Sequence, residues 1–208
     1  VLQEENTEDI QKMAAIVPTD TPYLKTSVME TFKKRIPWLL LLMISATITS
    51  QILTNFENKL ASVATLIAFI PMLMGTGGNS GGQSSVTIVR ALSLGEISLK
   101  DIFKVIWKEV RVGIVCGLVL AAVCFVKLLL FDKYVLGNSE ITVMISLVVS
   151  LTIVVEVVFS KVIGCCLPII AKKCGFDPAV MANPFITTIT DAVSLLIYIL
   201  FASVLLGI

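Results

Sequence analysis

The chain has 208 residues, of which 56% are hydrophobic and only 15% are charged. Soluble domains usually have about 25% charged residues, so this chain has too few to build a polar shell around its apolar residues. The formal net charge of +1 at pH 7 provides no basic surface for nucleic acid. The composition therefore predicts an all-α membrane protein.

The first 36 residues are polar and precede the apolar part of the chain. Residues 1–20 contain four early acidic residues and no signal peptide, so we expect a remnant of a soluble cytoplasmic domain cut from a longer protein. Residues 21–36 carry four basic residues and lead directly into Pro37. We expect this stretch to form a connecting, plug-type helix.

Five apolar segments predict five membrane spans, because a helix needs about 20 apolar residues to cross a hydrocarbon core of ~30 Å. Residues 36–56 and 60–89 carry no charge, and three later segments carry only isolated charges. The expected spans are residues 37–55, 60–91, 110–131, 140–170 and 183–208.

The distribution of Lys and Arg predicts the orientation of these spans. With a cytoplasmic N-terminus, segments 1–36, 90–111 and 161–182 lie inside and hold 13 of the 16 basic residues. Positive charge is retained on the cytoplasmic side during insertion. We therefore expect a multi-pass protein of the plasma or inner membrane, with its N-terminus cytoplasmic and its C-terminus outside.

The second span contains five glycines between residues 75 and 82. Each interior glycine costs a helix up to about 1 kcal/mol relative to alanine, so we expect a broken helix whose free carbonyls can face a cation. Alternatively, the spacing of Gly77 with Gly81, and of Gly78 with Gly82, lets two helices touch closely. A phosphate-binding loop is excluded, because Gln83 stands where its lysine belongs.

The fourth span has a polar face at helical spacing, on which Glu156 is the only acid. Three interpretations of Glu156 stay open: it lines an ion pathway, it pairs with Lys161, or it is a protonated structural acid. The other members of this face are Thr142, Ser146, Ser150, Thr152 and Ser160.

The fifth span begins at Asn183 and Pro184, a pair typical of a helix start. Its polar residues fall on one face and include Asp191, whereas Ile189, Val193, Leu196 and Leu200 lie opposite. The other polar members are Thr187, Thr190, Ser194 and Tyr198. A carboxylate within a membrane is by default functional, since burying it costs several kcal/mol. The alternative is a protonated Asp191 that bonds to a neighbouring helix.

Metal-cluster and enzyme chemistry find little support in this sequence. There is no histidine, and the five cysteines lack paired spacing, so a zinc site is not expected. No serine or cysteine stands beside a candidate base, so we expect the chain not to be an enzyme.

Three motifs in order resemble the MgtE family of magnesium channels. They are EENTEDIQKMAA followed by RIPWLLLL (residues 4–42), FIPMLMGTGGNSGGQSS with VRALSLGEI (residues 69–97), and NPFITTITD (residues 183–191). The resemblance covers almost the whole chain. In the place before the TGGN run where many members have an acid, this chain has Gly75.

The resemblance implies a homodimer in the lipid membrane, with a pore along its two-fold axis. It implies that Asp191 is the central Mg²⁺ site and that Asn79 and Asn183 line the pathway. We expect Thr187 and Gly78 to line the pore as well. Glu156, Gln83 and Ser194 are further pore-lining candidates. It also implies that cytoplasmic regulatory domains, including tandem CBS domains, precede residue 21 in the full-length protein.

The expected function is passive, potential-driven Mg²⁺ uptake, gated in the full-length protein by cytoplasmic Mg²⁺. Mg²⁺ gives up its water reluctantly, so a pore with few carboxylates and hydrated ions suits it. The alternative is an ion-coupled secondary transporter of divalent cations, although the inverted repeats that usually mark such folds are not evident.

Overall fold

A computed structural model of the chain describes residues 8, 10–14, 16–18, 22–61, 63–181 and 183–207, without the side chains of 57–61, 180, 181 and 183. The described part is helical and contains no strand, which confirms the all-α prediction. Its long helices are α2 (Val28–Ala61), α3 (Ile70–Ser93), α4 (Ile102–Val126), α5 (Val143–Lys173) and α6 (Asn183–Leu206).

Four helical segments of the described chain are long and apolar enough to cross a membrane. They are Val28–Phe56, Leu99–Val135, Val143–Lys173 and Pro184–Leu206. The second of these joins a short 3-10 turn (η3, Leu99–Asp101), α4 and a π-helix (η4, Lys127–Val135). Helix α3 is not among them, because glycine, serine and threonine fill its middle.

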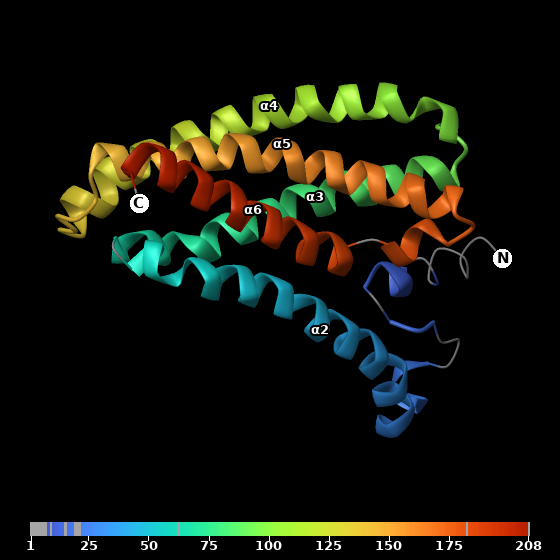
Figure 1. Cartoon of the computed structure of the whole chain (residues 1–208). Helices are drawn as coiled ribbons and strands as arrows, with labels where there is room; N and C mark the ends of the chain where they lie inside the picture. Colours follow the sequence, from blue (N-terminus) through green and yellow to red (C-terminus); the bar gives the residue numbers. More distant parts are fainter. Residues whose placement is uncertain are drawn as a thin grey trace.

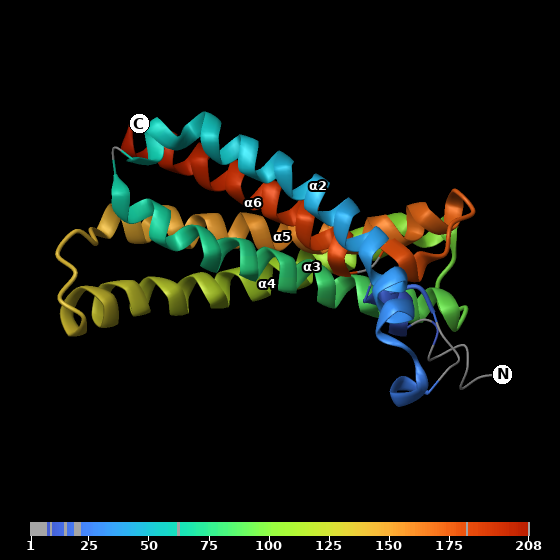
Figure 2. The same cartoon turned by 90° about the horizontal axis from the view of Figure 1, so that it is seen from below.

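Helix α5 is the centre of the bundle. It packs against α3, α4 and α6, while α2 packs mainly along α6. Figure 1 shows α2 diverging from the other helices toward its N-terminal end, and Figure 2 shows α2 beside α6 with α3 and α4 on the other side. The larger apolar core joins α3, α5 and α6 around Leu73, Val149 and Leu195.

The α4–α5 contact depends on glycine. A Cβ atom built on Gly113 would lie 3.0 Å from Val158 Cα, and one built on Gly117 would lie 3.0 Å from Val154 Cα. Since lipid is as apolar as leucine, membrane helices associate through such close packing rather than through hydrophobic burial. These two glycines therefore set how near α4 approaches α5.

The predicted break in the second span is wrong. Helix α3 runs without interruption through all five glycines, and the irregular segment lies before it, as a 3-10 helix (η2, Ala64–Phe69). The reason is tertiary packing: Gly77, Gly78, Gly81 and Gly82 are buried, so close contacts with neighbouring helices compensate for low helix propensity. The alternative of close helix contact is the one that the structure supports.

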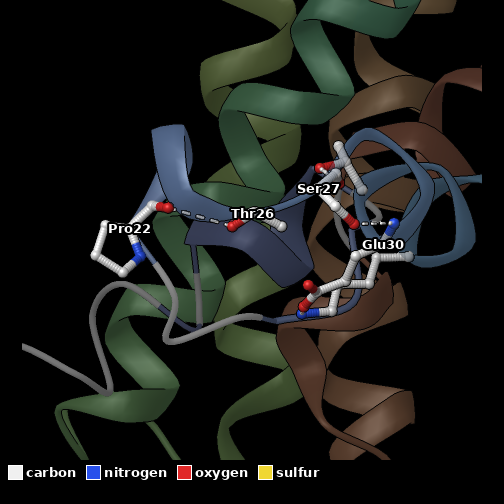
Figure 3. Close-up of polar contacts among 6 residues, drawn as sticks. Pro22, Thr26, Ser27 and Glu30 are labelled. Carbon is white, nitrogen blue, oxygen red and sulfur yellow. Dashed lines mark hydrogen bonds and ion pairs between the residues drawn. The ribbon is translucent and has the colours of Figure 1, made fainter.

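The connecting helix and the first span are one helix, α2, with Pro37 inside it. Its start is capped as shown in Figure 3, where the backbone N–H of Glu30 donates to Ser27 Oγ at 3.2 Å. The Thr26 hydroxyl donates to the Pro22 carbonyl at 3.3 Å in the preceding turn. A serine cap satisfies an otherwise unpaired N–H of the first turn, so α2 begins at Val28 rather than at residue 37.

The chain before α2 contacts the connection between α5 and α6. Lys12 Nζ lies 2.6 Å from Asp177 Oδ2 and 2.7 Å from Glu8 Oε1. Partial burial raises the pKa of Asp177, but the Lys12 ammonium and the Ala179 N–H outweigh it and hold that pKa below its usual range. The hydrogen bonds that the Lys12 ammonium donates to Asp177 and Glu8 raise the pKa of Lys12. This pair fixes the N-terminal segment to the connection between α5 and α6.

Helix α5 ends in a left-handed glycine that redirects the chain toward α6. Gly175 has a φ of 80°, which L side chains rarely adopt. The Phe176 N–H donates to the Ala171 carbonyl at 2.9 Å, and the Gly175 N–H donates to the Lys172 carbonyl at 3.2 Å. This pattern ends many helices. A short 3-10 helix (η5, Pro178–Met181) then leads to α6.

Candidate ion-binding site

Helix α6 has the two faces that its sequence predicts. Thr190, Ser194 and Tyr198 are buried, whereas Leu196 and Leu200 on the opposite side are exposed. The Tyr198 hydroxyl donates to the Leu66 carbonyl at 2.9 Å. The C-terminal part of the polar face therefore packs against η2. Asp191 lies on the same face, nearer the start of α6.

The glycines of α3 lie against side chains of α6. A Cβ atom on Gly78 would lie 3.0 Å from Thr187 Cγ2, and one on Gly77 would lie 2.5 Å from Ser194 Oγ. A Cβ atom on Gly81 would lie 2.7 Å from Ile186 Cγ2. The glycines thus bring the backbone of α3 against the polar face of α6. One of the residues that they contact there, Thr187, lies one turn before Asp191.

Asp191 is the candidate ligand that the structure leaves without a protein partner. Its side chain is half-buried and forms no hydrogen bond or ion pair with any described residue. The neighbouring threonines are occupied locally, since Thr187 and Thr188 both donate to the Pro184 carbonyl, at 2.9 and 3.0 Å. An intramembrane carboxylate of this kind needs a compensating cation or a proton.

The predicted pathway residues divide between two faces of α3. Gly78 faces Thr187 on α6, whereas Asn79 and Gln83 are exposed and line a groove that also contains Lys161. Successive residues of a helix are rotated by about 100° around its axis. Gly78 and Asn79 therefore face different neighbours. Helix α6 begins at Asn183, as predicted, but the side chain of Asn183 lies outside the described residues.

Glu156 is buried in the interior. None of its side chain is exposed, and the Ser194 hydroxyl of α6 lies close enough to interact with its carboxyl group. Glu156 forms no ion pair with Lys161, so that alternative is wrong. Residues five apart on a helix point about 140° from each other, which keeps the two side chains apart. The Ser194 side chain is likewise buried.

Sequence reasoning missed one buried polar contact between α3 and α4. The Ser84 hydroxyl donates to Glu109 Oε2 at 2.5 Å. Glu109 falls just before the predicted third span, and α4 extends this helix back to Ile102. The longer helix places Glu109 inside the bundle rather than in a loop.

A single chain offers a cation very few ligands. Among the described residues there is no group of three or more His, Cys, Asp or Glu side chains that could hold a metal ion. Mg²⁺ prefers octahedral oxygen and usually keeps several water molecules, so it needs only one or two carboxylates. The arrangement around Asp191 fits such a hydrated ion better than a fully dehydrated one.

Comparisons with known proteins agree with the resemblance in the sequence. The family model of MgtE, described as a divalent cation transporter, matches residues 70–201. The magnesium transporter MgtE of Thermus thermophilus is 36% identical over 206 residues, which are 99% of this chain and 44% of that protein. The proteins of that name from Bacillus subtilis and Enterococcus faecalis are 34% and 29% identical over 95% and 98% of this chain.

The chain spans less than half the length of these curated relatives, 42–44% of each. Helices α3, α4 and α5, most of α6 and the motifs in α3 and α6 fall within residues 70–201, which the family model matches, whereas α2 precedes them. The chain belongs to the MgtE family of divalent cation transporters.

Proposed function

We propose that this chain is the pore-forming membrane part of a homodimeric Mg²⁺ channel with five spanning helices, α2–α6. The observation that carries the proposal is Asp191, an intramembrane carboxylate without a protein partner on the polar face of α6. The relatives are named magnesium transporters, and Mg²⁺ is the cation that a sparse, hydrated oxygen site suits.

In the proposed dimer, two copies of Asp191 face each other across a two-fold axis. A symmetric dimer repeats the same surface on both subunits, so one carboxylate per chain becomes two at the axis. Thr187 lies one turn from Asp191 and flanks the ion, and Asn183 lies along the pathway at the start of α6. We place the N-terminus in the cytoplasm, on the distribution of basic residues.

Membrane potential supplies enough driving force for passive uptake. One charge gains about 2.3 kcal/mol per 100 mV, so a divalent ion gains about 4.6 kcal/mol at an inside-negative potential. A channel therefore needs no coupled ion. The competing proposal is a secondary transporter in which Asp191 carries a proton that moves with or against the divalent cation.

Flux into liposomes separates these two mechanisms. We expect purified protein to admit Mg²⁺ at a rate that rises with an imposed inside-negative potential and does not change when a pH gradient is imposed or collapsed. A fluorescent Mg²⁺ indicator and a pH indicator inside the vesicles measure both ions, with protein-free liposomes as the control. Proton movement in fixed ratio to Mg²⁺ would establish the transporter instead.

Cysteine labelling tests which face of α6 meets water. We expect Thr187→Cys to react with a small charged thiol reagent and Mg²⁺ to slow the reaction, because Thr187 lies one turn from Asp191. Leu196→Cys and Leu200→Cys, on the exposed apolar face, are the matched controls and should not react. Mass spectrometry of the peptide that contains each position excludes labelling of the five native cysteines. Equal reaction at both faces would show that α6 does not line the pathway as proposed.

Regulation in the full-length protein is part of the same proposal. Residues 1–20 are a remnant of a CBS-type cytoplasmic domain whose acidic groups repel one another until intracellular Mg²⁺ bridges them. The contact of Lys12 with Asp177 gives this segment a direct connection to the chain just before α6. Movement of the regulatory domain thereby reaches the helix that carries Asp191.

A further inference from the structure

A groove on the α4 side of α3 has an unusual lining. Its volume is about 510 Å³, and it lies between α3, α4 and α5. The α3 wall is polar, the α4 wall is almost wholly apolar, and Val157 and Lys161 of α5 form the base. The polar wall consists of Thr76, Asn79, Ser80 and Gln83, and the opposite wall of Val115, Cys116, Val119 and Leu120.

Lys161 is the group in this groove that most needs a partner. Only 5% of the residue is exposed, and it forms no ion pair with any described residue. Its stem passes close to Gly113, where a Cβ atom would lie 3.5 Å from Lys161 Cδ. An unpaired ammonium in a membrane span costs several kcal/mol. Glu109 on α4 accepts from Ser84 and forms no ion pair with Lys161.

The polar wall adds hydrogen-bond donors beside this ammonium. Ser80 is buried and its hydroxyl has no partner among the described residues, while the Gln83 amide is exposed. A cation with adjoining N–H and O–H donors binds an anion and repels Mg²⁺. The groove therefore differs in chemistry from the surface around Asp191.

The remaining features indicate that the anion belongs to a lipid. Val115, Val119 and Leu120 are 44–63% exposed, so the groove opens on an apolar surface that suits an acyl chain. Toward one end of the bundle, Thr87 and Arg90 continue the polar strip along α3 from Gln83. Exposed Lys108 and Arg111 precede Val115 on α4 by one to two turns. Basic pockets between membrane helices attract acidic head groups.

We propose that this Lys161 groove binds an anionic membrane lipid. The acidic group contacts the Lys161 ammonium, with Gln83 donating to it, and an acyl chain lies on the α4 wall. Free Mg²⁺ is excluded by the positive charge. The site is separate from Asp191 and does not depend on the ion that the chain transports.

Native mass spectrometry of the whole chain tests this proposal. The protein is purified in detergent with an equal mixture of phosphatidylglycerol and phosphatidylcholine that have the same acyl chains. We expect the native chain to retain phosphatidylglycerol preferentially. Lys161→Met should reduce that retention by about tenfold, since a hydrogen bond to a charged group is lost, and leave phosphatidylcholine unchanged.

Three variants make the result specific. Lys161→Arg keeps the charge and should retain the lipid, and Gln83→Leu should weaken retention severalfold without a change in charge. Lys133→Met, at the far end of η4, matches the charge change and should have no effect. Equal retention of both lipids by the native chain would overturn the proposal, as would undiminished phosphatidylglycerol in Lys161→Met. If Lys161→Met instead lowers the fraction of dimers and leaves phosphatidylglycerol retention unchanged, the groove is an interface between two copies of the chain and the proposal is wrong.

Discussion

Replacing Asp191 with alanine is expected to reduce Mg²⁺ uptake by at least about a hundredfold. In the proposed dimer the change removes both carboxylates that face the ion, and each charge-assisted contact contributes about 1.5–3 kcal/mol. Asp191→Asn should have nearly the same effect, because it keeps the size of the side chain and removes only its charge. Uptake into liposomes at a fixed inside-negative potential provides the measurement.

The stability of these variants separates loss of transport from loss of folding. Asp191 forms no ion pair or hydrogen bond with the described residues, so its removal leaves no partner unsatisfied. We expect the apparent melting temperature in detergent to stay the same or rise. Glu96→Ala, at an exposed acid beyond α3, serves as the control and should transport normally. Near-normal uptake by a well-folded Asp191→Ala protein would rule out Asp191 as the central site.

The second large effect concerns Gly164 on α5, where even a methyl group has no space. A Cβ atom there would collide with the carbonyl oxygen of Gly81 and lie 2.9 Å from its carbonyl carbon and 3.0 Å from its Cα. These are backbone atoms of α3, so no side-chain rotation relieves the contact. Overpacking in a well-packed interior costs about 1–3 kcal/mol, occasionally more, and we expect Gly164→Ala to lie at or above the top of that range.

Gly75→Ala is the matched control, since nothing lies within 4 Å of the position that its Cβ would take. Alanine favours a helix over glycine by about 1 kcal/mol, so this variant should be unchanged or slightly more stable. Thermal denaturation followed by size-exclusion chromatography compares the two. Equal melting temperatures for Gly164→Ala and Gly75→Ala would mean that α3 and α5 are not in backbone contact.

Elements set by local periodicity were predictable from the sequence. The start of α6 at Asn183 and its polar face follow from capping preferences and the helical repeat, and both agree with the structure. The glycine run of α3 was misjudged because propensity describes an isolated helix. The contacts of Gly77 and Gly81 with α5 and α6 are tertiary, and nothing in the local sequence specifies those partners.

Asp191 as an ion site is a prediction from the same kind of local pattern. Asp191 stands out in the sequence as an acid within an apolar helix, and its lack of a described partner is consistent with that reading. The groove around Lys161 could not be predicted, because its walls come from three helices that are far apart in the chain. Where a charge lies relative to other helices depends on how they pack, which a single helix does not determine.

The contact between Gly164 and Gly81 has a consequence for comparing relatives. The atom that excludes a side chain at position 164 is a carbonyl oxygen, and every amino acid carries one. No substitution at position 81 can therefore compensate for a larger residue at position 164. The two positions should show no correlated substitution despite their contact, so methods that infer proximity from paired sequence changes would not detect this contact between α3 and α5.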